Sequence, residues 1–251
     1  VRKILSVDWA QQCAAIIPCY NEGRTIAELV RAVRRCLPHV WVVDDGSRDD
    51  VAEQAAGAGA RVIRHAATRG KGAALQTGLC AAWSERFRWG LTLDGDGQHR
   101  PDEIPAFLAR WEMTRAPLIV GNRMARAQAM PWTRRHVNRW MSRRLSRLAG
   151  QPLPDSQCGY RLMELAAWSR LPISAQHFEI ESDLLLTFAR AGHPIDFVPI
   201  PVIHPPRPSR IQPLKDTWRW LRWWGRQHRI AGAAQLPQRQ AQPVAALASC
   251  E

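Results

Sequence analysis

The apolar run Trp89-Gly-Leu-Thr-Leu93 leads directly into Asp94-Gly-Asp-Gly-Gln98. An apolar run that ends in a Gly-containing turn is typical of a buried strand running into a tight loop. Asp94 and Asp96 stand two residues apart, and the amide of Gln98 follows two residues later. Carboxylate and amide oxygens are hard ligands that suit Mg²⁺ or Mn²⁺. We therefore expect a metal site formed by Asp94, Asp96 and Gln98, although a plain surface turn is the alternative for an isolated pair of aspartates.

Short apolar runs alternate with helical patterns on both sides of this stretch, as in α/β proteins with a mostly parallel sheet. We expect strands at 13–17, 40–44, 61–64, 90–94 and 118–121. We expect helices between them at 25–36, 50–58, 72–84 and 101–111. The predicted fold is a doubly wound α/β sheet whose N-terminal half binds a nucleotide, within one catalytic domain over 1–212.

Polar clusters follow three of these strands: Pro18 to Glu22, Asp44 to Ser47 and Asp94 to His99. Ligands of doubly wound sheets collect outside the carboxyl ends of the strands. Each cluster alone reads equally well as turn residues or, for Asp44 and Asp45, as helix capping. Three clusters at one edge favour a binding site, where Asp44 or Asp45 would meet a base or a ribose. Lys71 precedes a helix between two glycines and would meet a phosphate.

The formal net charge of +13 is concentrated in two regions. Residues 113–154 contain nine arginines and no acid, and residues 205–251 carry a net +6, which leaves −2 for the rest. Basic surfaces of this kind attract phosphate groups of nucleotides, lipid headgroups or nucleic acids.

The second half of the sequence is less regular. We expect an Arg-rich helix at 132–148, a loop at 152–161, a helix at 178–191, an extended Pro-rich segment at 195–208 and a Trp-rich helix within 213–234. The polar segment 235–251 is expected to be a disordered tail. In the Trp-rich helix a basic sector opposes a broad apolar arc. The basic sector consists of Lys215, Arg219, Arg222, Arg226 and Arg229, and the arc of Leu214, Trp218, Trp220, Leu221 and Trp224. This pattern favours a helix in the membrane interface, and packing on the domain is the alternative.

Membrane contact is expected to be peripheral, because no stretch reaches the roughly 18 to 20 apolar residues of a membrane span. Residues 1–7 lack the apolar core of a signal peptide. Six cysteines without a C-x-x-C pair are typical of reduced thiols. We therefore expect a cytoplasmic protein at the inner face of the membrane.

A set of motifs occurs in order along residues 13 to 212. They are Ile17-Pro-Cys-Tyr-Asn-Glu22, Val42-Val-Asp-Asp-Gly-Ser47, Gly70-Lys-Gly72, Asp94-Gly-Asp-Gly-Gln98, Gly121-Asn-Arg123 and Asp155-Ser-Gln-Cys-Gly-Tyr-Arg161. The chain resembles glycosyltransferase family 2, and within it the dolichol- or polyprenol-phosphate mannosyltransferase-like branch. The resemblance implies the glycosyltransferase A fold, a divalent metal ion and transfer with inversion at the anomeric carbon. It is much less specific for the sugar, so GDP-mannose and UDP-glucose both stay open as donors.

The resemblance and the strand-end clusters together give the expected site residues. The nucleotide-binding set is Pro18, Tyr20, Asn21, Glu22, Asp44, Asp45, Lys71, Asp94 and Gly95. Arg123, Arg134, Arg135 and Arg207 would bind the acceptor phosphate, and Asp94, Asp96 and Arg123 would carry the catalysis.

The acceptor decides whether the enzyme needs a general base. A phosphate monoester with a second pKa of about 6 is largely dianionic at neutral pH and needs none. If the acceptor were instead a hydroxyl of a soluble molecule or a glycan, Glu179, Glu181 or Asp183 would be the base. A solvated helix start is the alternative explanation for these three acids.

Other classes fit the sequence less well. A nucleotidyltransferase would carry a Gly-rich triphosphate loop near residues 18–25, which is absent from the sequence. A basic nucleic-acid-binding or membrane-binding protein without catalysis would account for the charge and the 12 tryptophans. It would not account for acidic clusters at three strand ends, which would repel a phosphate backbone. No nucleic-acid partner is therefore expected, and the predicted partners are a nucleotide sugar, a lipid phosphate and an anionic membrane surface.

Overall fold

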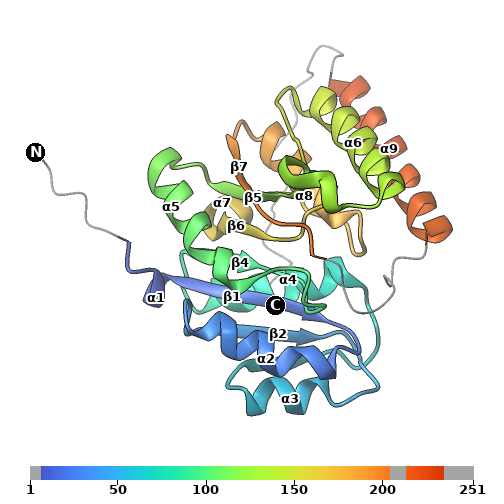
Figure 1. Cartoon of the computed structure of the whole chain (residues 1–251). Helices are drawn as coiled ribbons and strands as arrows, with labels where there is room; N and C mark the ends of the chain where they lie inside the picture. Colours follow the sequence, from blue (N-terminus) through green and yellow to red (C-terminus); the bar gives the residue numbers. More distant parts are fainter. Residues whose placement is uncertain (1–6, 204–212, 235–251) are drawn as a thin grey trace, which may run out of the picture.

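The computed structural model describes residues 7–203 and 213–234, with side chains described for 7–203 and 218–229. The described residues form one seven-stranded sheet in the order β3-β2-β1-β4-β6-β5-β7 (Figure 1). The strands are β1 (Cys13–Cys19), β2 (Val40–Asp44), β3 (Arg61–Arg64), β4 (Trp89–Thr92), β5 (Leu118–Asn122), β6 (Arg161–Glu164) and β7 (Ile195–Pro199). Arg207 and the segment 235–251 lie outside the described residues.

The sheet places the predicted polar clusters at one edge. β1 pairs in parallel with β2 on one side and with β4 on the other, so the strand order reverses between β1 and β4. Cys19 at the end of β1 lies opposite Asp44 at the end of β2. A crevice therefore opens beyond the ends of β1 and β4, where ligands of doubly wound sheets bind.

Helices lie on both sides of this sheet (Figure 1). They are α1 (Trp9–Gln12), α2 (Gly23–Arg34), α3 (Val51–Gly57), α4 (Lys71–Ser84), α5 (Ile104–Thr114), α6 (Trp132–Ala149), α7 (Leu165–Trp168), α8 (Ile180–Arg190) and α9 (Pro213–Ala234), with 3-10 turns η1 (Pro101–Glu103) and η2 (Arg123–Ala129). α2 forms because Ile26, Leu29, Val30 and Val33 recur at helical spacing, and all four are buried.

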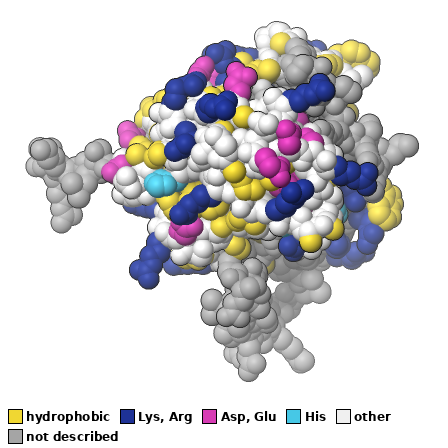
Figure 2. All heavy atoms as spheres, turned by 90° about the horizontal axis from the view of Figure 1, so that it is seen from below, with side chains coloured by type: hydrophobic (Ala, Val, Ile, Leu, Met, Phe, Trp, Pro, Cys, Tyr) yellow, Lys and Arg dark blue, Asp and Glu magenta, His cyan; other side chains and the backbone are white. Residues whose placement is uncertain are grey.

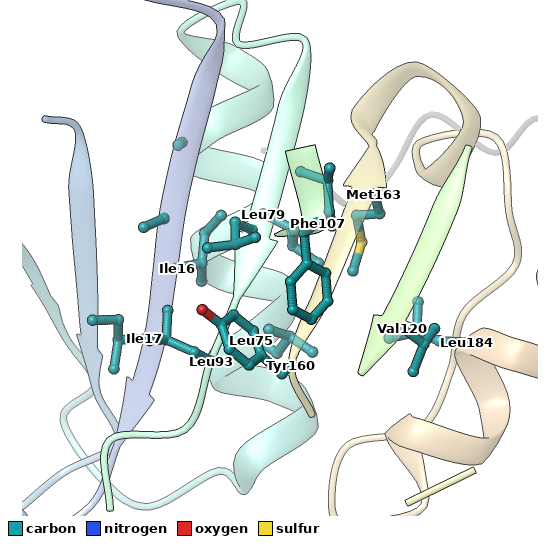
Figure 3. Packing of buried hydrophobic residues seen from close by; sticks show 14 of the residues in the cluster. Ile16, Ile17, Leu75, Leu79, Leu93, Phe107, Val120, Tyr160, Met163 and Leu184 are labelled. Carbon is teal, nitrogen blue, oxygen red and sulfur yellow. The ribbon is translucent and has the colours of Figure 1, made fainter. Parts of the chain in front are cut away.

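The core continues from the first strands to the second half of the chain. Figure 3 shows Ile16 of β1 and Leu79 of α4 beside Phe107, Tyr160 and Met163. α4 approaches β1 closely at Gly78, where a Cβ atom would stand 2.4 Å from Ile16 Cγ2. This close approach holds the start of α4, and with it Lys71, against the crevice.

Two strands depart from the sequence expectation. Arg161 begins β6, which lies antiparallel between β4 and β5, although 152–161 was predicted as a loop and no strand was predicted after it. β7 occupies part of the segment predicted only as extended, and it pairs in parallel with β5. Both strands are short, and β7 is half-buried at the sheet edge, so neither shows the apolar run or alternation that marked the first five.

Candidate active site

Lys71 joins two carboxylates at the mouth of the crevice, the half-buried Asp94 and the buried Glu181. Its Nζ atom lies 2.6 Å from Asp94 Oδ1 and 2.6 Å from Glu181 Oε1. Asp94 follows β4, Lys71 is the first residue of α4, and Glu181 lies in the first turn of α8. The site therefore brings together three segments that are far apart in the sequence.

The charges of this cluster stabilise one another. Burial alone would raise the pKa of Asp94, but the ammonium of Lys71, with smaller contributions from His99 and Arg123, lowers it to about 2. Burial would lower the pKa of Lys71, but Asp94 and Glu181 outweigh this effect and raise it. Asp94 is therefore a carboxylate and Lys71 an ammonium at neutral pH.

Asp96 and Gln98 lie side by side on the loop after Asp94. Asp96 accepts hydrogen bonds from the backbone N–H of Gln98, at 3.0 Å, and from the Gln98 amide. His99 Nδ1 accepts a hydrogen bond from the Asp94 N–H at 3.0 Å, which fixes the start of this loop. The contact between the side chains of Asp96 and Gln98 places both potential metal ligands on the same side of the loop.

Gly159 leaves room over the Asp94 carboxylate. A Cβ atom at this position would stand 2.9 Å from Asp94 Oδ1 and 3.0 Å from Lys71 Nζ, so a side chain would obstruct the cluster. The described residues contain no group of three His, Cys, Asp or Glu side chains that could hold a metal ion. The oxygen donors of the two aspartates and Gln98 would nevertheless suit a hard divalent cation, with substrate phosphates and water as its remaining ligands.

Asp45 organises the loop that leads to Lys71. Its carboxylate lies 2.7 Å from His65 Nδ1 and accepts the backbone N–H groups of Arg69 and Gly70 at 2.9 and 2.8 Å. Asp44 is fully buried, accepts the N–H of Ser47 at 2.8 Å and pairs with Arg64 at 3.1 Å. We predicted that one of the two aspartates points into the cleft, and in the structure both are engaged by neighbouring backbone and side chains.

The loop after β1 is tied to the other two loops. Pro18 lines the same pocket as Lys71 and Asp94. The N–H of Asn21 donates to Ser47 Oγ at 2.8 Å, and Asn21 Oδ1 accepts the N–H of Arg48 at 2.7 Å. Tyr20 is 37% exposed, and Glu22 is the residue that precedes α2. Gly95 belongs to the buried part of the site, where its carbonyl accepts the hydroxyl of Thr25 at 2.9 Å. The predicted nucleotide residues are thus gathered at one edge.

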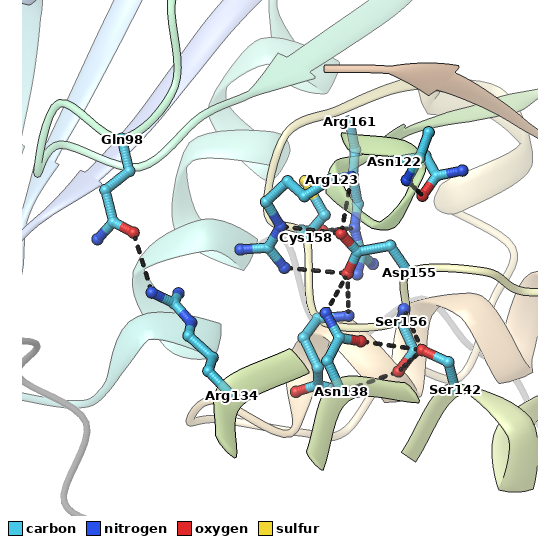
Figure 4. A network of polar contacts seen from close by, with 12 residues as sticks. Gln98, Asn122, Arg123, Arg134, Asn138, Ser142, Asp155, Ser156, Cys158 and Arg161 are labelled. Atoms are coloured by element: carbon cyan, nitrogen blue, oxygen red, sulfur yellow. Dashed lines mark hydrogen bonds and ion pairs between the residues drawn. The ribbon is translucent and has the colours of Figure 1, made fainter. Parts of the chain in front are cut away.

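Arg123 is held by a bidentate ion pair (Figure 4). Its Nε and Nη2 atoms lie 2.9 and 3.0 Å from the two oxygens of Asp155, which also accepts the backbone N–H of Arg123. Asn138 of α6 donates a further bond to Asp155 at 2.9 Å. Burial would raise the pKa of Asp155, but Arg123 and Asn138 together lower it. This network fixes the guanidinium plane of Arg123.

The second predicted phosphate ligand, Arg134, lies beside Gln98, one of the three predicted metal ligands. Arg134 Nη1 is 3.5 Å from Gln98 Oε1 (Figure 4), and both residues line a pocket with His99, Arg123, Met130 and Val202. Burial lowers the pKa of Arg134, and Arg123 adds to this effect. Arg135 is half-buried, and its Nε has no hydrogen-bond partner among the described residues.

The three candidate bases are buried, so the solvated helix start offered as their alternative explanation is wrong. Glu179, Glu181 and Asp183 are 9%, 4% and 2% exposed. Both oxygens of Asp183 accept hydrogen bonds, one from Trp223 Nε1 at 2.9 Å and the other from the N–H groups of Ser174 and Ala175. Sequence spacing shows the first turn of a helix but not the elements that cover it.

Two further residues of the site escaped the sequence analysis. His65 bridges Asp45 and Thr77, and a histidine shortly after a predicted strand gave no signal of that contact. Arg161 is buried behind Asp94, where it donates to the carbonyls of Cys158 and Glu181 at 2.8 Å. The sequence shows Arg161 at the end of the motif Asp155 to Arg161. Its contacts could not be predicted, because they depend on the antiparallel strand β6.

Comparison with known proteins identifies the family. A model described as "Glycosyl transferase family 2" matches residues 14–170. The chain is 28% identical over 212 residues to UDP-N-acetylglucosamine–dolichyl-phosphate N-acetylglucosaminyltransferase of Methanococcus voltae, covering 75% of this chain and 84% of that protein. It is 29% identical over 183 residues to polyprenol monophosphomannose synthase of Mycolicibacterium smegmatis, covering 66% of each.

Solved structures show the same fold. Glucosyl-3-phosphoglycerate synthase from Mycobacterium tuberculosis, in complex with Mn²⁺, UDP-glucose and phosphoglyceric acid, superposes with a TM-score of 0.67 at 21% identity, covering 90% of this chain and 81% of that one. The predicted glycosyltransferase A fold is confirmed, and the names of the relatives agree with the polyprenol-phosphate branch that the motifs indicated. The chain belongs to glycosyltransferase family 2.

Proposed function

We propose that this glycosyltransferase moves a hexose from a nucleotide sugar to a polyprenyl phosphate with inversion at the anomeric carbon. One observation carries the proposal: the acidic site of Asp94, Asp96 and Gln98 adjoins the basic pocket that contains Arg123 and Arg134. Arg134 Nη1 lies 3.5 Å from Gln98 Oε1 and so connects the two. The acidic site suits a metal-bound diphosphate, and the basic pocket between Arg123 and Arg134 suits an acceptor phosphate. Relatives named for dolichyl-phosphate and polyprenol transfer support the same acceptor class.

Asp94, Asp96 and Gln98 would hold Mg²⁺ or Mn²⁺, which would neutralise the charge that develops on the departing nucleoside diphosphate. Lys71 adds a second positive charge beside Asp94. Pro18, Tyr20, Asn21 and Glu22 would enclose the nucleoside, with Asp44 and Asp45 shaping the loops around it. The chain itself thus supplies positioning and charge compensation.

The state of the candidate bases favours a phosphate acceptor over a hydroxyl acceptor. Asp183 is fully engaged by hydrogen bonds, and Glu181 is paired with Lys71. A phosphate dianion needs no deprotonation, so Arg123 and Arg134 need only align it with the anomeric carbon. A family 2 transferase that glycosylates a hydroxyl is the second candidate, with the buried Glu179 as its base.

The test is a transfer assay with purified protein, Mn²⁺ and a panel of radiolabelled nucleotide sugars, with and without added polyprenyl phosphate. We expect label in the lipid fraction only when polyprenyl phosphate is present. Asp96→Ala should abolish transfer and leave the fold intact. Asp102→Ala is the matched control, because Asp102 lies on the surface with a side chain 67% exposed.

Two results would contradict the proposal. Full activity of Asp96→Ala would show that Asp96 does not hold an essential metal ion. Label appearing on a sugar hydroxyl, with none on polyprenyl phosphate, would establish the second candidate instead. The lipid acceptor also implies that the enzyme works at the inner face of the membrane, in the cytoplasm. No helix in the described part of the chain combines the length and apolar character needed to cross a bilayer.

A further inference from the structure

α6 is packed on one side and exposed on the other. Asn138, Ser142 and Leu145 are buried at a spacing of four and three residues. On the opposite side Trp132, Val137 and Trp140 are 68%, 57% and 45% exposed. Large apolar side chains on the exposed side of an otherwise polar helix need a partner or a special environment.

α9 has the same division, and it corrects the predicted apolar arc. Trp220 and Trp223 are buried, and their indole N–H groups donate to Ser182 and Asp183 of α8 at 3.1 and 2.9 Å. Trp220 was expected at the membrane, whereas Trp223 was missing from the arc. Trp218 and Leu221 are 57% and 49% exposed. The helix therefore packs on the domain with one arc and exposes a second, smaller apolar set.

The two helices contact each other. α6 and α9 lie side by side (Figure 1), and the rings of Trp140 and Trp220 are 5.7 Å apart. Each exposed set includes a tryptophan beneath an arginine: Arg144 lies 4.6 Å from the ring of Trp140, and Arg222 lies 4.7 Å from that of Trp218. Tryptophan and arginine are thus paired on both helices.

The charged residues of α6 are all of one sign. α6 carries six arginines, at 134, 135, 139, 143, 144 and 147, and no acidic residue. The face of the molecule on the side of α2 and α3 is different, because acidic and basic side chains are interspersed there (Figure 2). A strongly basic region with exposed tryptophans complements a surface that is both anionic and partly apolar.

We propose that Trp132, Val137, Trp140, Trp218 and Leu221, with the arginines of α6 and α9, form a surface that binds an anionic phospholipid bilayer. The biological role of this α6–α9 surface, which is to hold the enzyme beside its lipid acceptor, rests on the proposed function. Indole rings insert among lipid headgroups while arginines contact lipid phosphates. A nucleic acid would contact the arginines but would leave exposed aliphatic side chains such as Leu221 without a partner.

The start of α6 contributes to both the exposed surface and the basic pocket. Trp132 is the first residue of α6, and Arg134, two residues later, reaches Gln98 of the acidic site. A bilayer on the α6–α9 surface would therefore place lipid headgroups next to Arg123 and Arg134. The phosphate of a membrane-embedded acceptor could enter the pocket without leaving the headgroup layer.

The experiment is co-sedimentation of the whole chain with vesicles of equal parts phosphatidylcholine and phosphatidylglycerol, and with vesicles of phosphatidylcholine alone. We expect binding to the anionic vesicles that weakens as salt rises. Trp132→Ser/Trp218→Ser should bind at least about tenfold more weakly, because two exposed rings no longer insert. Trp83→Ser is the matched control, since Trp83 is 38% exposed on α4, and its binding should be unchanged.

Point variants are preferable to removal of α9, which would also remove Trp223 from the core. The vesicles contain no polyprenyl phosphate and no donor is added, so the result does not depend on transfer. Equal binding by the double variant and the wild type would overturn the proposal, as would no binding by the wild type. Tight binding to duplex DNA at physiological salt, with none to vesicles, would show that the surface serves a nucleic acid.

Discussion

At the residue scale, the contact between Lys71 and Asp94 bears directly on the proposed metal site. An ammonium 2.6 Å from Asp94 Oδ1 competes with a divalent cation for the same carboxylate. Glu181, at the same distance from Lys71, offers the ammonium a second partner. Whether Asp94 can turn to a metal therefore depends on how strongly Glu181 holds Lys71.

Two variants should change metal affinity in opposite directions. Lys71→Met removes the competing cation, so its Kd for Mn²⁺ without nucleotide should fall about threefold to tenfold. Glu181→Gln removes one of the two carboxylates that contact Lys71, so Lys71 should hold Asp94 more strongly. The Kd for Mn²⁺ should therefore rise by a similar factor. Isothermal titration calorimetry with Mn²⁺ measures both, and Lys71→Arg, which keeps the charge, is the control. Weaker Mn²⁺ binding by Lys71→Met would show that the lysine supports the site instead of competing for it.

Arg123 and Asp155 form a second test at this scale. Asp155→Asn leaves a buried guanidinium without its anionic partner and should lower the free energy of unfolding by about 3–5 kcal/mol. Arg123→Met/Asp155→Asn removes both charges and should recover part of that loss, without recovering transfer. Urea denaturation and the transfer assay provide the two readouts. Recovery of both activity and stability in the double variant would exclude Arg123 from acceptor binding.

Sequence reasoning at this scale found residues but not their partners. The position of Asp94, Asp96 and Gln98 at the end of a strand could be predicted, because a strand pattern led directly into them. The contact of Lys71 with Glu181 could not, because it joins the start of α4 to the start of α8 across 110 positions of the sequence. The role of Asp45 was also hidden, because its carboxylate accepts hydrogen bonds from backbone N–H groups of a loop that carries no side-chain signal.

At the element scale, α9 shows why a helical pattern predicts a helix more easily than its orientation. Trp218, Trp220, Trp223 and Trp224 cover most of the helix circumference, so spacing alone does not select the packed side. The selection comes from α8, whose Ser182 and Asp183 accept the indole N–H groups of Trp220 and Trp223. A tryptophan whose N–H meets a buried acceptor packs inward.

This difference predicts unequal costs for two similar substitutions. Trp223→Ala removes a fully buried ring and leaves a cavity and an unpaired Asp183 oxygen, so the free energy of unfolding should fall by about 3–5 kcal/mol. Trp218→Ala, at a position 57% exposed, should change it by no more than about 0.5 kcal/mol. Urea denaturation of both variants measures the difference. Equal losses would mean that α9 does not pack through Trp223.

At the scale of the whole molecule, the sheet order explains both the success and the limits of the sequence analysis. The first four strands follow a doubly wound pattern, so their shared edge could be predicted from alternation alone. β6 lies between β4 and β5 and runs antiparallel to both. This long-range pairing could not be predicted, because β6 has only four residues and a charged residue at each end. That insertion nevertheless positions Arg161, Gly159 and Asp155, and so completes the site.

The carboxylates with depressed pKa values predict how the whole molecule responds to acid. Asp94 and Asp155 have folded-state pKa values below their ordinary value of 3.8, that of Asp94 being about 2. A carboxyl group with a depressed pKa stabilises the fold fully above its unfolded pKa and loses that contribution as pH falls toward its folded pKa. The free energy of unfolding should therefore decline from about pH 4 to about pH 2. Urea denaturation at a series of pH values at constant salt measures this decline.

Asp155→Asn should reduce the slope in this range, whereas Asp102→Asn, which alters the net charge equally from an exposed position, should leave it unchanged. An equal effect of both variants would mean that general repulsion in a chain of net charge +13, and not the buried carboxylates, governs unfolding in acid.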